Sequence, residues 1–401
     1  MNRLLPHILS PFVLACILYG QEAVSDVDAL INEALNEQFG EDLLDDPELR
    51  ELLGENLLKE VAEEPKWDHD LKVRTGLGHG DNVLYGAYEQ VGSGYFFASV
   101  DGLVFRLPEP GQANAYIYFY GEHISYFEDV DPGRLYITQG QVSQTWGETR
   151  QVGLMATHIF YDQVFDASAD LDSFTSFGVS AHQVEVIPYL EAYLSNDLHF
   201  KMEALMGGAY YEDPYEDSRN RGGRLTFRKK LGELSRLEAV ISHDSRRYRE
   251  KNPRDADGYS VDGLLHFTIN EASLRWWRSA VEPDGWAFSS KLGYLEQEDN
   301  ASGYYDYSRL RVKQSASRSV SDWDVTLSAG FTRYDYSVRN ADFSGSDKLW
   351  REGIEAALNL KRTLNDRAAF FLDGQFEHNR SNAAENIYDA NRIVVGVEWG
   401  I

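Results

Sequence analysis

From Trp67 to the C-terminus the sequence alternates between apolar and polar residues with a period of two, over unusually long segments. In residues 323–332, apolar positions from Trp323 to Phe331 alternate with Asp, Thr, Ser and Gly. Residues 184–194, 198–206 and 353–361 repeat this pattern. A period of two places successive side chains on opposite faces of a β-strand. The sequence therefore predicts an all-β chain whose strands have one apolar and one polar face.

The length of these segments distinguishes a membrane barrel from a soluble sandwich. They run about 10 to 16 residues, whereas strands of globular sheets usually have about 5–6 and tilted membrane-spanning strands about 9–11. Several also carry charged residues on the polar face, which a sealed core could not bury but a wet lumen can accommodate. We expect a closed antiparallel transmembrane β-barrel of about 16 strands (about 14–18). This count treats Tyr259–Arg278 as one long strand.

Connections and tryptophans predict which way the barrel faces. Short connections alternate with longer polar ones, and barrels of this kind place short turns on the periplasmic side. The short connections are Pro108–Gln112, Gly147–Thr149, Asn196–Asp197 and Leu364–Arg367, and the longer ones include Tyr211–Asn220, Arg249–Gly258 and Asn340–Lys348. Seven of the eight tryptophans fall near the predicted periplasmic strand ends, namely Trp67, Trp146, Trp276, Trp277, Trp286, Trp323 and Trp399. Indole rings favour the headgroup level, so we expect one aromatic girdle there.

The first 66 residues differ from the rest. Residues 1–20 have a basic start at Arg3 and a mostly apolar stretch, which is typical of an export signal peptide. The only cysteine, Cys16, lies in this segment, where residues 13–16 also faintly resemble a lipidation site. Residues 21–66 are acidic and show two helical apolar stripes, which predicts a periplasmic helical segment. It is interpreted as a solvated extension, or alternatively as a plug or a docking site for a periplasmic partner. Residues 67–401 form the predicted barrel.

Composition excludes several functional classes. The net charge is −27, so a nucleic acid partner would be repelled. Beyond the first 20 residues no run of about 20 apolar residues occurs, which argues against membrane-spanning helices. The acidic loop residues Glu212, Asp213, Glu216 and Asp217 could offer oxygen ligands to Ca²⁺ or Mg²⁺, but without a fixed ligand spacing. We interpret them as solubilising loop residues, and expect neither a metal nor a cofactor.

One short motif superficially suggests a hydrolase. Ser242, His243 and Asp244 are consecutive, and neighbours on a strand point to opposite faces. His243 therefore cannot form a catalytic triad with these two residues. No catalytic residue is predicted.

The C-terminal segment carries the most specific resemblance. Residues 393–401 alternate Ile393, Val395, Val397, Trp399 and Ile401 with mostly polar or small residues. The tail with Gly396, Trp399 and Ile401 resembles the terminal strand of Gram-negative outer-membrane β-barrel proteins, including porins. This resemblance implies an outer-membrane location and insertion by the barrel-assembly machinery. Residues 76–83, with the run Gly80-Asp81-Asn82-Val83, also distantly resemble the opening of the barrel of surface lipoprotein assembly modifiers.

Inward-facing charged residues are the best candidates for function. The predicted lumen-lining set is Lys72, Arg74, Glu185, Glu191, Glu203, Arg224, Arg228, Lys230, Arg309, Arg311, Lys313, Asp373 and Glu377. Opposed basic and acidic walls would filter solutes by charge. Alternatively, these residues form ion pairs that only satisfy the wall. We expect a passive porin-like channel for small hydrophilic solutes. The alternative is a structural or protein-export-related barrel whose lumen is plugged.

Overall fold

The computed structural model describes residues 67–400, except for 89, 107–112, 148, 166–176, 196, 283 and 342–346. The predicted signal peptide, the acidic segment 21–66 and Ile401 therefore lie outside the described residues. No helix among the described residues is long and apolar enough to cross a membrane.

Sixteen strands follow one another along the described chain, and they confirm the predicted number. Two short 3-10 helices, η3 (Pro214–Glu216) and η4 (Ala384–Asn386), lie in connections. The strands are β1 (Trp67–Gly80), β2 (Ser93–Arg106), β3 (Asn114–Tyr126), β4 (Gly133–Trp146), β5 (Arg150–Phe165), β6 (Phe177–Ser195), β7 (Leu198–Tyr211), β8 (Ser218–Lys230), β9 (Ser235–Tyr248), β10 (His266–Arg278), β11 (Ala287–Asp299), β12 (Tyr307–Val320), β13 (Trp323–Asn340), β14 (Lys348–Asn365), β15 (Ala368–Ser381) and β16 (Tyr388–Gly400).

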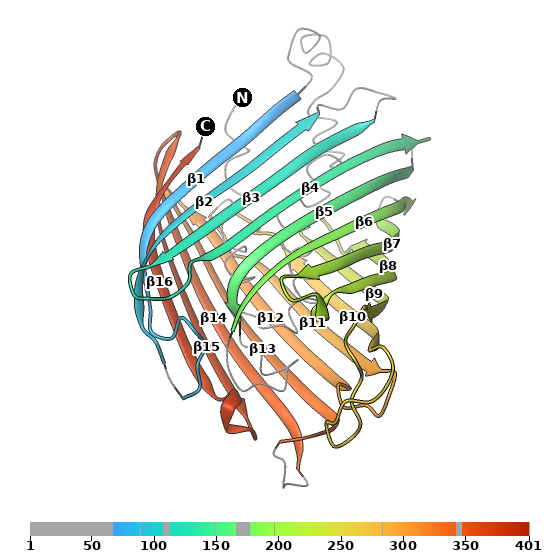
Figure 1. Ribbon diagram of the computed structural model, residues 1–401. Coiled ribbons are helices and arrows are strands. Elements are labelled where there is room, and N and C mark those ends of the chain that lie inside the picture. The colour runs from blue at the N-terminus through green and yellow to red at the C-terminus, as the bar shows by residue number, and fades with distance from the viewer. Residues whose placement is uncertain are drawn as a thin grey trace.

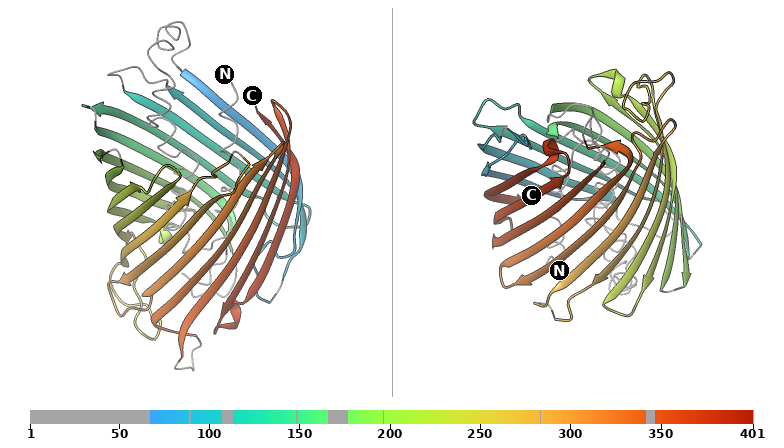
Figure 2. Two further views of the ribbon diagram at one scale, coloured as in Figure 1. Left: turned by 180° about the vertical axis from the view of Figure 1, so that it is seen from behind. Right: turned by 90° about the horizontal axis from the view of Figure 1, so that it is seen from below.

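The sheet closes on itself into an antiparallel barrel, as Figures 1 and 2 show. Every strand pairs with its neighbours in sequence, and β1 pairs with β16 over the register from Lys72↔Gly400 to Gly80↔Arg392. Closure leaves no unpaired edge, which satisfies the backbone groups that a membrane interior cannot hydrate.

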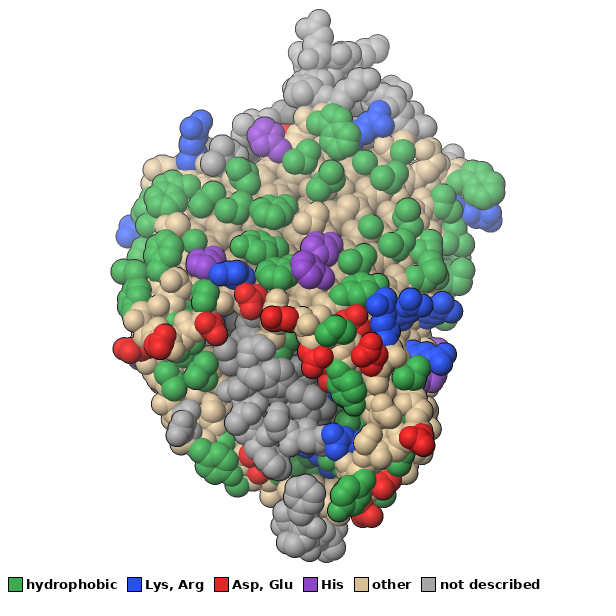
Figure 3. All heavy atoms as spheres, in the orientation of Figure 1, with side chains coloured by type: hydrophobic (Ala, Val, Ile, Leu, Met, Phe, Trp, Pro, Cys, Tyr) green, Lys and Arg blue, Asp and Glu red, His purple; other side chains and the backbone are tan. Residues whose placement is uncertain are grey.

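The period-two pattern divides the side chains into an outer and an inner set. Ile117, Ile241 and Leu310 are exposed on the outer face, whereas Tyr118 and Arg309, next to Ile117 and Leu310, are buried on the inner face. Figure 3 shows hydrophobic side chains spread over the wall of one side, with acidic ones gathered toward the rim opposite the C-terminus. An apolar outer surface of this extent is stable in lipid but not in water.

The two rims differ as predicted. Short turns such as residues 231–234 and 366–367 lie at the rim where β1 begins and β16 ends, whereas long connections such as 249–265 lie at the other. The seven tryptophans predicted for the first rim fall at strand ends or in a turn there, and Trp350 lies at the opposite end, near the start of β14. Short turns and an aromatic girdle mark this rim as periplasmic.

One predicted strand was too long. The segment Tyr259–Arg278 was expected to be a single strand, and the structure places only His266–Arg278 in β10. Residues 259–265 belong to the preceding loop, where Gly263 has a φ of 126°, in a region that L side chains rarely adopt. The segment does not split at Asn270, so the strand count is unaffected.

Candidate functional site

All residues predicted to line the interior occupy inward positions of their strands. Most are buried, and Lys230, at the periplasmic end of β8, is exposed. The structure groups many of them into networks with partners that the sequence analysis did not identify. Those partners also occupy inward positions, so alternation alone could have found the residues but not the pairings.

The first network lies at the seam where β1 meets β16. Arg74 donates through Nη2 to Asp373 Oδ2 at 2.6 Å, and its Nε lies 3.7 Å from Glu398 Oε2. Lys361 Nζ lies 2.6 Å from Glu398 Oε1, and the Arg74 guanidinium stacks 3.8 Å from the centroid of Phe371. Four strands, β1, β14, β15 and β16, are thus joined by charged groups that are mostly removed from water. The network stabilises closure of the barrel, because a buried charge is stable only with partners.

The second network lies on β6, β7 and β8. Glu191 has Lys201 Nζ at 3.3 Å and His199 Nε2 at 3.6 Å. Lys201 is also 3.4 Å from Glu203, whose other oxygen lies 3.7 Å from Arg224. The acids predicted for this wall therefore alternate in space with cations. Neighbouring charges of this kind largely cancel over the distance at which a solute would sense them.

The wall of β11 and β12 is a basic part of the interior. Four cationic side chains face inward here: Lys291 on β11, and Arg309, Arg311 and Lys313 on β12. Lys291 and Lys313 are direct cross-strand partners. Two ion pairs of this wall are long, with Arg309 at 3.9 Å from Glu271 and Arg311 at 3.9 Å from Glu355. We name this set the basic wall.

A glycine allows one of these pairs to form across an intervening strand. Glu355 lies on β14 and Arg311 on β12, so the pair must pass over β13. At Gly330 on β13, a Cβ would stand 2.1 Å from Glu355 Oε1. The absence of a side chain at residue 330 therefore leaves the space that the Glu355 carboxylate occupies.

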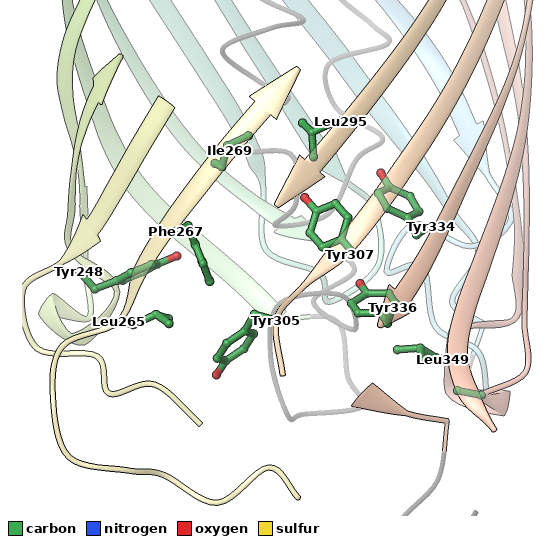
Figure 4. Packing of buried hydrophobic residues seen from close by; sticks show 11 residues of the cluster. Tyr248, Leu265, Phe267, Ile269, Leu295, Tyr305, Tyr307, Tyr334, Tyr336 and Leu349 are labelled. Atoms are coloured by element: carbon green, nitrogen blue, oxygen red, sulfur yellow. The ribbon is translucent and has the colours of Figure 1, made fainter. Parts of the chain in front are cut away.

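The outer half of the interior is not the polar surface that the alternation predicted. Tyrosine and aliphatic side chains gather there in two buried clusters, one on β3 to β7 and one reaching from β9 toward β15. Figure 4 shows the second cluster, with Phe267 on β10 and with Tyr307 and Tyr334 on the paired strands β12 and β13. Tyrosine satisfies both an apolar contact and a hydrogen bond, so it suits a wall that borders water.

At the outer rim, Lys251 ties two loops together. Its Nζ lies 2.8 Å from Glu216 Oε2 and 5.1 Å from the Tyr248 ring centroid. Burial by itself lowers the pKa of Lys251, but Tyr248 and Glu216 together raise it above its ordinary value. Lys251 therefore remains charged, and it anchors the loop of residues 249–265 to η3.

The serine–histidine–aspartate run has no triad geometry. His243 lies on the outer face, where its Nδ1 is 2.7 Å from Asn270 Oδ1 on β10. Ser242 and Asp244 occupy inward positions of β9. Among the described residues, no group of three or more His, Cys, Asp or Glu side chains is arranged to hold a metal ion.

The C-terminal strand places two of the predicted assembly residues in different settings. Trp399 is exposed on the outer face near the periplasmic rim. Gly396 faces inward and is the direct cross-strand partner of Gly76 on β1. A Cβ at Gly396 would stand 2.1 Å from the Thr75 carbonyl oxygen and 2.6 Å from the Phe371 ring. Gly396 is therefore required by the close approach of backbone and ring at the seam.

We expect Gly396→Ala to lower the folded fraction of the purified chain several-fold on refolding into lipid vesicles, because the seam cannot close around the methyl group. The measurement is the heat-dependent shift of the folded band in SDS gels. Gly374→Ala is the matched control, since a Cβ at Gly374 on the next strand meets nothing within 4 Å. Normal refolding of Gly396→Ala in vesicles, with failure only in cells, would show that the glycine acts in recognition rather than in packing.

These observations define the class of protein. A closed antiparallel barrel of 16 strands with an apolar outer wall, an aromatic periplasmic girdle and a charged interior is a Gram-negative outer-membrane β-barrel.

No known protein-family model matches the chain, and no curated protein sequence matches it. Several solved structures are similar. OccAB3 of Acinetobacter baumannii has 8% identity and a TM-score of 0.48, covering 84% of this chain and 99% of that one. OprD of Pseudomonas aeruginosa has 11% identity and a TM-score of 0.43, covering 84% and 95%. A loop L8 deletion mutant of OmpT, an outer membrane protein of Vibrio cholerae, has 11% identity and a TM-score of 0.41, covering 84% and 99%.

Proposed function

We propose that the barrel is a passive porin-like channel for small hydrophilic solutes and that it favours anions. The observation that carries this proposal is the basic wall. Glu271 and Glu355 approach two of its four inward cations at 3.9 Å, and Glu238, in the same cross-strand row as Lys291, is already paired with Arg228 at 2.8 Å. The acids of β6 and β7, by contrast, lie beside Lys201 and Arg224.

An uneven distribution of this kind favours anion passage. Where acids and cations alternate, a passing ion experiences little net potential. Along the basic wall, each cation contributes on the order of 1 kcal/mol to a nearby anion in a wet lumen. A chloride or small carboxylate would therefore be concentrated along β11 and β12, as in other pores lined by rings or rows of charge.

One observation favours the alternative, a barrel of structural or export-related role with a closed lumen. Many inward side chains are almost fully buried, with Arg309 3% and Leu295 1% exposed. A wide water-filled lumen would expose them more. The acidic segment 21–66 is the part of the chain predicted to serve as a plug or to dock a periplasmic partner.

Swelling of proteoliposomes separates the two functions. Vesicles containing the full chain are diluted into isotonic sugars of increasing mass, and into solutions of a small carboxylate and of a cationic solute of equal size. We expect swelling whose rate falls with sugar size and is several-fold faster for carboxylates than for cationic solutes of equal size. Swelling that appears only after deletion of residues 21–66 would support the plugged alternative. No swelling with either protein would remove the channel function.

A further inference from the structure

A group of arginines lies on the outer, lipid-facing surface of β8 and β9. Arg219 and Arg221 on β8 and Arg247 on β9 are all exposed, at the outward positions of their strands. Arg219 and Arg247 are direct cross-strand partners, and Arg221 is the partner of Ser245. We name Arg219, Arg221 and Arg247 the outer arginine patch.

The outer arginine patch lacks the carboxylates that accompany other outward arginines. Arg134 on β4 has Asp162 at 3.5 Å, and Arg333 on β13 has Glu352 at 2.7 Å. Within residues 67–400 as described, no ion pair or hydrogen bond involves the guanidinium group of any patch arginine. On the side of the patch that faces β10, the nearest outward acids are on β11, namely Glu296 and Glu298. They lie two strand spacings, or about 10 Å, from Arg247.

Two guanidinium groups placed directly opposite each other on one face repel, which destabilises a strand pair. An anion between them converts this repulsion into two attractive contacts. The planar fork of arginine matches the oxygens of a phosphate group in a bidentate arrangement. The outer arginine patch therefore fits a phosphate better than a compact monovalent anion.

Depth in the membrane identifies which phosphate can reach it. His266 on β10 is the cross-strand partner of Arg247, and Trp276 of the periplasmic girdle is ten residues further along β10. At about 3.4 Å per residue and a tilt of about 40°, these levels are about 26 Å apart along the membrane normal. The apolar band of such barrels is about 25 Å tall, so the patch lies at the outer headgroup level.

Below the patch, two polar rows follow, Ser245 with Thr268 and His243 with Asn270, and from there to the periplasmic girdle the outer surface is apolar. Leu225, Ile241 and Leu274 occupy outward positions between the patch and the periplasmic girdle, and all are exposed. A molecule bound at the patch thus meets phosphate-binding arginines at the outer headgroup level. Toward the periplasm it meets an apolar surface against which acyl chains can pack. This arrangement suits a phosphorylated lipid rather than a free ion.

We propose that the outer arginine patch binds the phosphorylated sugar headgroup of lipid A in the outer leaflet. Arg219 and Arg247 hold one phosphate between β8 and β9. Arg221, two residues further along β8 toward the periplasm, also binds the phosphorylated headgroup. The acyl chains lie along β8 to β10. This site is independent of the lumen, so it holds whether or not the barrel conducts.

Native mass spectrometry of the purified full chain in detergent tests the site. Diphosphoryl lipid A, lipid A lacking phosphate, and inorganic phosphate are titrated separately. We expect saturable binding of diphosphoryl lipid A, weakened roughly tenfold or more by the combined change Arg219→Gln, Arg221→Gln and Arg247→Gln. Arg134→Gln is the matched control, because Arg134 is an outward arginine already paired with Asp162, and it should bind within twofold of the unaltered chain.

Three results would overturn the proposal. Equal binding by the triple variant would show that the arginines do not hold the lipid. Equal binding of lipid A lacking phosphate would show that only the acyl chains are recognised. Saturable binding of inorganic phosphate at concentrations comparable to those of lipid A would identify a general anion site. Heat-dependent migration in SDS gels confirms folding, and the three single substitutions, each expected to weaken binding, replace the triple variant if it does not fold.

Discussion

Replacing Arg309, Arg311 and Lys313 together by glutamate is expected to raise the cation-over-anion permeability ratio several-fold. Each replacement converts a positive into a negative charge, so the basic wall changes by six units. With about 1 kcal/mol per charge for an ion in a wet lumen, even partial exposure to the permeating ion suffices for this change. Reversal potentials across a planar bilayer in a salt gradient measure the ratio directly.

Two further variants distinguish charge from shape. Arg309→Lys with Arg311→Lys retains both charges, so the permeability ratio should remain unchanged. Glutamine at all three positions should give an intermediate ratio, and it avoids new repulsion with Glu271 and Glu355, which lie 3.9 Å from the two arginines. An unchanged reversal potential in the conducting glutamate variant would place the permeating ions elsewhere in the barrel.

Arg74→Met is expected to destabilise the barrel by about 3–5 kcal/mol, because it leaves a buried carboxylate without its partner. Asp373 is the group most affected: its side chain is only 5% exposed, and Arg74 Nη2 lies 2.6 Å from it. The free energy of unfolding can be measured by urea titration in lipid vesicles, followed by tryptophan fluorescence.

The paired change Arg74→Met with Asp373→Leu should recover most of that loss, since replacing both members of a buried pair by apolar residues is often close to neutral. As a matched control, Arg134→Met breaks the more exposed pair with Asp162 and should cost only about 0–1 kcal/mol. If Arg74→Met were no more harmful than Arg134→Met, the network at the seam would not be what stabilises closure.

The sequence was sufficient for the architecture because a half-buried strand must alternate. Wherever one face meets lipid and the other water, as along Leu310, Arg311 and Val312, period two is unmistakable. Strand length then identified a membrane barrel, and the tryptophans agreed with the assigned rim without having been used to place strands.

The alternation of apolar and polar residues does not show which face is inward where both faces of a strand are apolar. It also predicts a strand wrongly where a loop has apolar residues at strand spacing. On β3, inward Tyr118 and Tyr120 flank outward Phe119, so the sequence gives no sign of which face is inside, and the aromatic lining of the outer half was missed. In residues 259–265, Tyr259, Val261 and Leu265 fall at strand spacing, but the positive φ of Gly263 interrupts the extended backbone there.

The pairings inside the barrel depend on the register between distant strands. Arg74 and Asp373 are 299 residues apart, and only closure through β16 brings them to one level. Likewise, Glu355 reaches Arg311 because residue 330 on the strand between them is glycine. A one-residue shift at any pair of strands would rearrange these contacts, so the list of inward charges could be predicted but their partners could not.

The central claim is that this outer-membrane barrel conducts small ions through its interior. Single-channel recording of the purified full chain in a planar bilayer tests it most directly. We predict discrete conductance steps and a reversal potential that indicates anion preference in a salt gradient. An electrically silent bilayer, with the correctly folded full chain and with the variant lacking residues 21–66 alike, would contradict the claim.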